Sequence, residues 1–249
     1  MPHIEGAQSV LAALAARRRK ISVVLVRHDA SKQNVREVIE LAEASNVPVR
    51  HVDGDELDKL AHGTSHGGVI AISLPVPKFD RAEFDDLLKG ISSPLLLLLE
   101  GVDDDRNLGF TIRSAEALGA HALLVKKHLW DFDETEVART SSGAYERLPI
   151  VQFEGLDLVR DLQKQGLQLL GCLAGARAAI FDVDLRPPTI LAIGGEKRGL
   201  SGAIREICDR FVSIPSIGGA SSLSLSHAGA IVLSEAFRQR RATSAFHAN

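Results

Sequence analysis

A run of apolar residues from Pro94 to Leu99 constrains the fold of this chain more than any other feature of its sequence. Its five successive leucines make both faces of a strand apolar, which is typical of a strand buried on both sides in a parallel sheet. Strand-like and helix-like segments alternate before and after this run, as they do in α/β domains. The sequence therefore predicts an α/β protein with a mostly parallel sheet.

A segment with two prolines divides the expected elements into two groups. Leu74-Pro75-Val76-Pro77-Lys78 is the linker candidate, because prolines in extended context stop both a helix and a central strand. The group before it is a compact α/β unit whose first helix, 7–19, ends in a basic cluster. We predict an N-terminal domain over residues 1–74, a linker over 75–92 and a larger domain over 93–249.

Composition excludes several classes of protein. The 249 residues include 29 Lys and Arg against 32 Asp and Glu, so bulk charge does not favour nucleic acid, although a local basic patch remains open. No apolar run approaches the ~20 residues of a membrane span, and the N-terminus lacks a secretory pattern. Two cysteines and nine histidines without ligand spacing predict no metal site. We expect a reduced, cytoplasmic setting.

Three loops follow expected strands and lead into expected helices, where α/β sheets bind their ligands. They cover residues 99–113, 193–200 and 213–224. Each loop alone has an ordinary structural interpretation: acidic residues that complement a helix dipole, a strand–helix turn, and hydroxyls that cap a helix. Asn107 and Arg113 in the first loop are candidates for contact with a phosphate, because arginine forks onto phosphate oxygens.

Taken in order, the three loops resemble the SpoU (TrmH-like) family of RNA ribose 2′-O-methyltransferases. The resemblance covers essentially the whole chain. The N-terminal unit is similar to the ribosomal-protein-like RNA-binding domain of the subgroup that modifies large-subunit ribosomal RNA. The matching residues are Asp105 to Gly109, Arg113 to Ala115, Leu118-Gly119, Gly194 to Glu196, Gly199-Leu200, Ile214-Pro215, Ser221 to Leu223, Ser226 and Ala228, with Ile4 to Gly6 and His66 to Val69 in the N-terminal unit.

This resemblance implies a SPOUT domain with a deep trefoil knot, a homodimer joined through the knotted domains, and S-adenosylmethionine bound in the knot largely by backbone. It assigns the cofactor to Gly194, Ile214, Leu223, Leu173 and Gly195. In the N-terminal unit, the RNA-binding candidates are His66 and the basic cluster of Arg17, Arg18, Arg19 and Lys20, for which a solvated helix end is the alternative. Arg113 would stabilise the ribose alkoxide, Asn107 and Glu196 would orient groups, and Ser222 and Ser224 would complete the catalytic set. Ser224 stands where the family usually has Asn, Gly195 where it often has Asn or Ala, and Gly67 where it usually has Gln.

Several functions compete. The leading hypothesis is an active 2′-O-methyltransferase acting on ribosomal RNA, with transfer RNA as an alternative substrate. A weak or inactive RNA-binding homologue is the second hypothesis, because of Ser224. A nucleotide-linked oxidoreductase is disfavoured by the missing dinucleotide fingerprint. Gly63-Thr64-Ser65-His66-Gly67 matches the hydrolase elbow, but it follows an expected helix and opens a strand, the reverse of what that elbow requires.

Overall fold

The structure is a computed structural model that describes residues 3–30, 33–62, 66–127, 131–217 and 223–245. For residues 242–245 it describes the backbone alone. The chain forms two compact units. The first unit contains residues 1–77 and 132–147, and the second contains 78–131 and 148–249. Residues 132–147 thus join the first unit although they lie inside the range predicted for the second domain.

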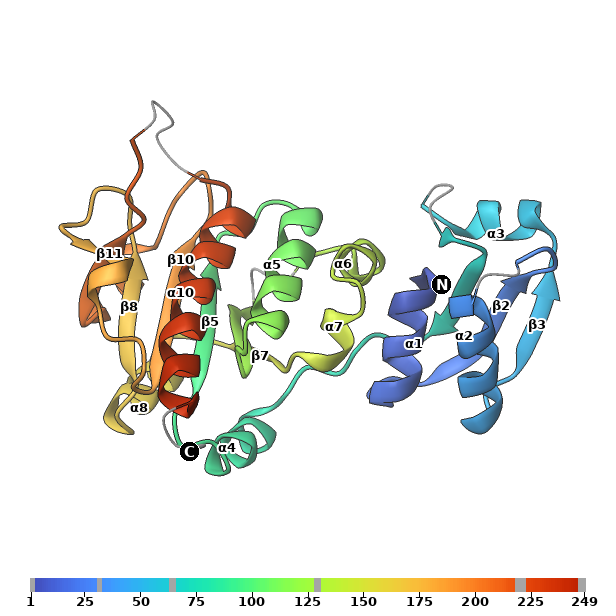
Figure 1. The fold of residues 1–249 in the computed structure, drawn as a ribbon, viewed down its shortest axis with the longest axis horizontal. Helices are drawn as coiled ribbons and strands as arrows, with labels where there is room; N and C mark the ends of the chain where they lie inside the picture. Colours follow the sequence, from blue (N-terminus) through green and yellow to red (C-terminus); the bar gives the residue numbers. More distant parts are fainter. Residues whose placement is uncertain (1–2, 31–32, 63–65, 128–130, 218–222, 246–249) are drawn as a thin grey trace. The chain divides into compact units, whose positions relative to one another are not determined.

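The first unit is built on a four-stranded sheet with the strand order β1-β4-β2-β3 (Figure 1). β4 runs antiparallel to β1 and β2, whereas β2 and β3 are parallel. The segment whose sequence matches the hydrolase elbow lies after helix α3 and before strand β4, in the order expected from the sequence. Its residues Gly63 to Ser65 lie outside the described residues. The elements are β1 (His3–Glu5), α1 (Ala7–Ala16), β2 (Ile21–Arg27), α2 (Gln33–Ala44), β3 (Val49–Val52), α3 (Gly54–Leu60), β4 (Val69–Ser73), α6 (Glu134–Thr140) and α7 (Ala144–Arg147).

A buried ion pair ties the two parts of the first unit together. Arg19 directs Nη2 and Nε to the two carboxylate oxygens of Glu146 at 2.6 and 3.0 Å, and both side chains are almost fully buried. Arg19 Nη1 also donates to Ser73 Oγ at 3.2 Å. Burial raises the pKa of Glu146, and the Arg19 guanidinium opposes this rise. Each charge therefore depends on the other for its place in the interior.

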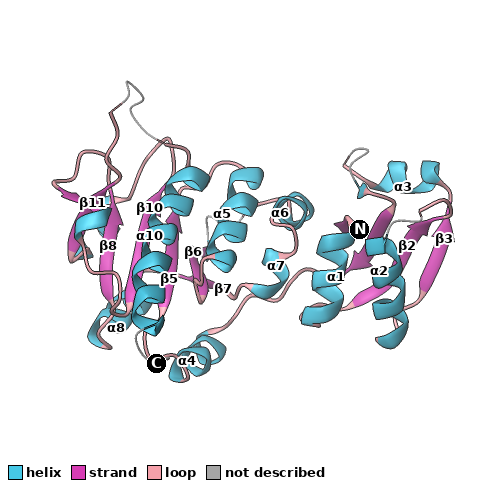
Figure 2. Cartoon of the chain, in the orientation of Figure 1, coloured by secondary structure: helices cyan, strands magenta, loops and turns pink. Residues whose placement is uncertain are grey.

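The second unit is built on a seven-stranded sheet with the order β7-β6-β5-β10-β8-β11-β9, in which every adjacent pair is parallel (Figure 2). The predicted parallel α/β sheet is confirmed. Its elements are α4 (Arg81–Lys89), β5 (Leu95–Glu100), α5 (Asp105–Ala117), β6 (Ala122–Lys126), β7 (Ile150–Phe153), α8 (Asp157–Lys164), β8 (Gln168–Cys172), β9 (Ala178–Ala179), the 3₁₀ turn η3 (Ile180–Asp182), β10 (Thr189–Gly194), α9 (Gly202–Ile207), β11 (Arg210–Ser213) and α10 (Leu225–Ala245).

Helices cover this sheet on both faces, so the leucine strand β5 is fully buried. Leu96 and Leu98 belong to a core cluster that includes residues of α4, α8 and α9. The alternating side chains of a strand point to opposite faces, so Leu95, Leu97 and Leu99 face the other side. On one face α5 and α10 pack side by side (Figure 1).

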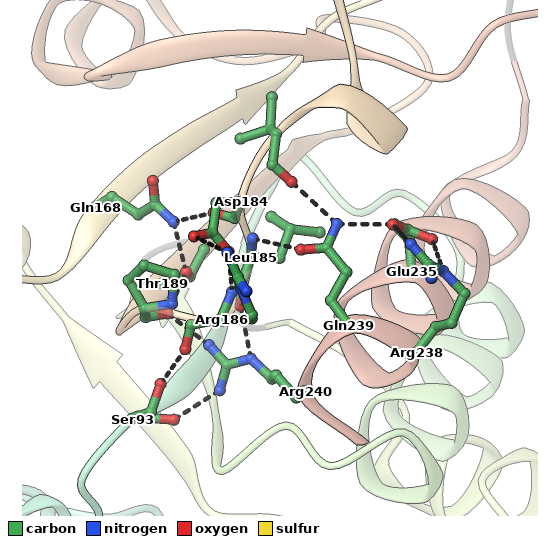
Figure 3. A network of polar contacts seen from close by, with 12 residues as sticks. Ser93, Gln168, Asp184, Leu185, Arg186, Thr189, Glu235, Arg238, Gln239 and Arg240 are labelled. Atoms are coloured by element: carbon green, nitrogen blue, oxygen red, sulfur yellow. Dashed lines mark hydrogen bonds and ion pairs between the residues drawn. The ribbon is translucent and has the colours of Figure 1, made fainter. Parts of the chain in front are cut away.

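The second half of α10 is fixed by hydrogen bonds to backbone groups (Figure 3). Gln239 accepts from Leu185 N at 2.8 Å and donates to Val183 O at 3.0 Å. The Arg240 guanidinium donates to the carbonyl oxygens of Leu185, Ser93 and Pro187 at 2.6 to 2.8 Å. α10 has 21 residues, yet neither it nor any other described helix combines the length and apolar composition needed to cross a membrane.

Two adjacent glycines let the backbone after β10 pass close to other backbone. A Cβ atom on Gly194 would lie 2.0 Å from the carbonyl carbon of Gly199. A Cβ atom on Gly195 would lie 1.6 Å from the carbonyl oxygen of Gly101, in the loop that follows β5. The family-typical Asn or Ala at this second position therefore has no room here.

The buried ion pair yields a prediction about stability. Arg19→Met should lower the free energy of unfolding by about 3–5 kcal/mol, because the Glu146 carboxylate would stay buried without its cation. Without Arg19 the folded-state pKa of Glu146 lies further above its unfolded value, so the loss should be smallest below about pH 4.5 and grow as the pH rises. Chemical denaturation at several pH values measures this. The exposed Lys89→Met, which breaks the surface pair with Asp86, should leave stability unchanged.

The close approach at Gly194 yields a second prediction. Gly194→Ala should lower the free energy of unfolding by about 1–3 kcal/mol, because the added methyl group meets backbone rather than a movable side chain. Gly202→Ala is the matched control, since nothing lies within 4 Å of a Cβ atom there and its backbone has no positive φ. Equal denaturation midpoints for the two variants would contradict this account.

Candidate functional site at the carboxyl edge of the parallel sheet

The loops that follow β8, β10 and β11 meet at one edge of the sheet, because all three strands are parallel. They enclose a pocket of about 260 Å³. All five residues predicted to bind a cofactor line this pocket, although they come from four separate segments. Its described lining consists of Cys172, Leu173, Ala174, Ile193, Gly194, Gly195, Glu196, Gly199, Val212, Ser213, Ile214, Ser216, Leu223, Leu225, Ala228 and Val232.

The pocket is walled mainly by aliphatic side chains and backbone, with its acidic group, Glu196, exposed to solvent. Cys172 is the one sulfur-bearing residue of the described lining. Burial, helped by the nearby Cys208, raises the pKa of the Cys172 thiol to about 12. At neutral pH this side chain is a neutral thiol rather than a nucleophilic thiolate.

Beside the pocket, a polar network joins the first residues of α5 and α10 to the loop after β10. The amide nitrogen of Asn107 donates to Glu196 Oε1 at 3.3 Å, and its oxygen accepts from Ser226 Oγ at 2.9 Å. The backbone N–H of Leu225 also donates to Glu196 Oε1, at 3.3 Å. A carboxylate at a helix N-terminus is stabilised by the helix dipole, so Glu196 both caps α10 and holds the Asn107 amide.

Ser224 extends this network toward the surface. Its Oγ lies 3.1 Å from Ser226 Oγ and 2.6 Å from Nδ1 of His227. The backbone N–H of His227 also donates to Ser224 Oγ, at 3.4 Å, so Ser224 caps the start of α10. The structure thus brings together three of the predicted catalytic residues, Asn107, Glu196 and Ser224.

The other two predicted catalytic residues are not in this network. Ser222 lies outside the described residues. Arg113 lies six positions after Asn107 on α5, which turns the two side chains roughly 120° apart around the helix axis. Its side chain is exposed, and no hydrogen bond or ion pair to another described residue holds it.

Two residues of the network were not among the sequence candidates. Ser226 appeared only as a family match, and His227 was not singled out. The signal for His227 was its spacing of three from Ser224 at a helix start, where side chains three apart are neighbours. No sequence signal pairs Ser226 with Asn107, because their contact depends on how α5 and α10 pack.

The predicted RNA-binding residues of the first unit have different surroundings. Arg17 and Lys20 are exposed, whereas Arg18 donates to the backbone oxygens of Glu146 and Pro77. Burial removes Arg19 and His66 from the predicted RNA surface. Arg19 is held by Glu146. The Nδ1 atom of His66 accepts a hydrogen bond from Gly68 N at 3.1 Å, and its Nε2 atom lies 2.9 Å from Asp58 Oδ1.

Models of two protein families match the chain. The SpoU rRNA Methylase family matches residues 94–234, which include all three loops and the pocket. The RNA 2′-O ribose methyltransferase substrate binding family matches residues 3–78, which cover most of the first unit.

Curated relatives and solved structures agree with this match. The chain is 33% identical to the 23S rRNA (guanosine-2′-O-)-methyltransferase RlmB of Photobacterium profundum over 96% of its length and 98% of the relative. It is 35% identical to RlmB of Xanthomonas axonopodis over 95% of its length and 96% of the relative. The SpoU methyltransferase AviRb of Streptomyces viridochromogenes, solved in complex with AdoMet, superposes with a TM-score of 0.79 at 30% identity, covering 96% of this chain and 90% of AviRb. The chain therefore belongs to the SpoU rRNA methylase family, and the prediction made from its three loops is confirmed.

Proposed function

We propose that this chain transfers a methyl group from S-adenosylmethionine to a ribose 2′-OH of ribosomal RNA, the kind of RNA named for its relatives. The family match supports the reaction class. The observation that carries the proposal to this chain is the pocket itself. All five residues assigned to the cofactor line it, and the Asn107–Glu196 contact lies next to it.

The pocket suits S-adenosylmethionine in its chemistry. Ile193, Val212 and Val232 provide apolar walls of the kind that an adenine ring requires. Backbone at Leu173, Gly194 and Ile214 would supply hydrogen bonds, and this explains the absence of a dinucleotide fingerprint. When bound, the cofactor supplies an electrophilic methyl group on a sulfonium.

The side chains beside the pocket would act on the ribose. The 2′-OH is a poor nucleophile until its proton leaves or its alkoxide is stabilised, and a cation nearby favours the alkoxide. Arg113 is the candidate, because its exposed guanidinium is not neutralised by any described carboxylate. Asn107, held by Glu196 and Ser226, would position the ribose.

We also propose that the second unit contains the trefoil knot of the family. In its sheet, β10 is inserted between β5 and β8, although it follows β8 and β9 in the chain. The backbone after β10 also passes so close to the loop after β5 that Gly195 has no space for a Cβ atom. Such tight contact between loops from distant parts of the chain fits a threaded backbone.

A homodimer through the second unit would explain why three of its phenylalanines are exposed. Phe110 on α5, Phe181 on η3 and Phe237 on α10 are 46%, 52% and 39% exposed. Large exposed aromatic residues of this kind are typical of an interface. Arg113 is three residues from Phe110, on the same side of α5. In such a dimer it would lie at the interface.

The first unit is the proposed RNA-binding domain, and the second the methyltransferase domain. Arg17 and Lys20 are the exposed members of the basic cluster and remain candidates for phosphate contacts. The predicted cytoplasmic location remains a prediction.

An RNA-binding protein with little activity is the second candidate. Ser224 favours it, because a hydroxyl has a shorter reach than the usual Asn and lacks the paired donor and acceptor of an amide. Methyl transfer to unmodified RNA by the wild-type protein separates the two candidates. Transfer RNA is the alternative substrate in the same assay.

Arg113→Ala is the principal test of the proposed mechanism. It should lower the rate of methyl transfer by ~10²–10³, since one preorganised charge is lost. Affinity for S-adenosylmethionine, measured by calorimetry without added metal, should stay the same because Arg113 does not line the pocket. Arg186→Ala, at a similarly exposed arginine that pairs with Asp184, is the control and should keep its rate. A normal rate for Arg113→Ala would remove this residue from the mechanism.

Ser224 yields a separate prediction. Ser224→Ala should reduce the rate a few-fold, because Ser226 and His227 lose their partner at the end of the network. Ser224→Asn should keep or raise the rate by restoring an amide. If the wild type is inactive on several unmodified RNAs while it binds the cofactor, and Ser224→Asn is active, the chain is an RNA-binding homologue.

A further inference from the structure

Two histidines and a glutamate from separate segments of the first unit direct their polar atoms toward one point. His3 Nε2 lies 3.0 Å from Glu5 Oε1, and His62 Nδ1 lies 3.0 Å from the same oxygen. One possible ligand atom from each residue lies within 4.8 Å of the other two. The two imidazole rings are stacked, with centroids 5.4 Å apart.

Glu5 is buried, and its second carboxylate oxygen is unsatisfied. The residue is 1% exposed, and Oε2 accepts no hydrogen bond from any described residue. Burial raises the pKa of Glu5, but hydrogen bonds from the backbone and ring of His62 and from His3 outweigh this effect and lower it. Oε2 is therefore a lone oxygen in an interior where a buried polar atom normally has a partner.

A second carboxylate orients His62. Asp133 Oδ2 lies 3.0 Å from Nε2 of His62, on the side of the ring away from Glu5. A carboxylate that accepts a hydrogen bond from one ring nitrogen directs the lone pair of the other nitrogen, as is usual for histidines that bind metals. Asp133 is itself fixed, because its Oδ1 accepts from Thr135 N at 2.9 Å at the start of α6.

We propose that His3, Glu5 and His62 bind a divalent transition metal, with Zn²⁺ as the best fit, and that Asp133 orients His62. Two imidazole nitrogens and one carboxylate are a common donor set for Zn²⁺. Tetrahedral bonds of ~2.0–2.1 Å place ligand atoms about 3.3 Å apart, so the two 3.0 Å contacts need to open only slightly. The metal ion replaces the protons that these contacts share, so its binding releases protons.

The metal would join three segments that are distant in the sequence. His3 and Glu5 lie on β1, His62 follows α3, and Asp133 precedes α6. The site therefore has a structural role in the first unit and is independent of the cofactor pocket in the second. Spacing along the chain does not reveal it, because only His3 and Glu5 are close in sequence.

The test uses chelator-treated, tag-free full-length protein. Co²⁺ should bind at one equivalent per chain with the visible absorption bands of a four- or five-coordinate nitrogen–oxygen site, and Zn²⁺ should displace it. Calorimetry should show that Glu5→Gln and His62→Ala weaken Zn²⁺ binding at least tenfold. Asp133→Asn, which changes only the orienting group, should weaken it ~10–100-fold. Zn²⁺ should raise the melting temperature of the wild type but not of Glu5→Gln.

A second stacked histidine pair in the same unit provides the matched control. His28 and His51 have ring centroids 5.8 Å apart and are exposed, and among the described residues no third ligand completes a metal-binding group around them. The double variant His28→Ala/His51→Ala should bind Zn²⁺ as the wild type does. The absence of stoichiometric Co²⁺ bands in the wild-type protein would overturn the proposal. His3, Glu5, His62 and Asp133 would then form an ion-pair network without a metal. Binding that survives Glu5→Gln and His62→Ala, or is lost in the control, overturns it too.

Discussion

The pairing of β10 with both β5 and β8 is the constraint on which the second unit depends. Leu191 on β10 lies opposite Leu97 on β5 and Leu170 on β8, so β10 has a parallel neighbour on each side. Because all these strands are parallel, the loops that follow them end at one edge of the sheet. The pocket and the polar network are consequences of this one insertion.

Close backbone contact explains the glycine at the start of the loop after β10. Position 195 accepts only glycine here, because Gly101 O occupies the space of a Cβ atom. The same contact holds Glu196 where its carboxylate can cap α10 and bind the Asn107 amide. Backbone packing alone thus accounts for Gly194 and Gly195, whether or not a ligand also approaches them.

The sequence predicted the parallel sheet because strand burial depends on local patterns, whereas the five pocket residues were predicted from the resemblance to the SpoU family. The continuous apolar residues of the leucine strand indicate that it is buried. The positions of the three loops follow from where the expected strands end. The role of Arg19 could not be read in this way. A basic residue at a helix end resembles a phosphate contact, and its partner Glu146 lies 127 residues away. The His3–Glu5–His62 cluster was missed for the same reason, since tertiary packing alone brings its members together.

Two poor nucleophiles meet the same electrophile in the proposed reaction, and their surroundings decide which one reacts. Cys172 lines the pocket, and a thiolate there would compete for the methyl group. Burial raises the pKa of its thiol to about 12, so the side chain is a neutral thiol at neutral pH. A ribose hydroxyl is as weak an acid, but it would meet the exposed cation of Arg113, which favours its ionised form. In the proposed reaction, burial without a cation would keep the cysteine neutral, and the surface cation of Arg113 would favour the ionised form of the hydroxyl.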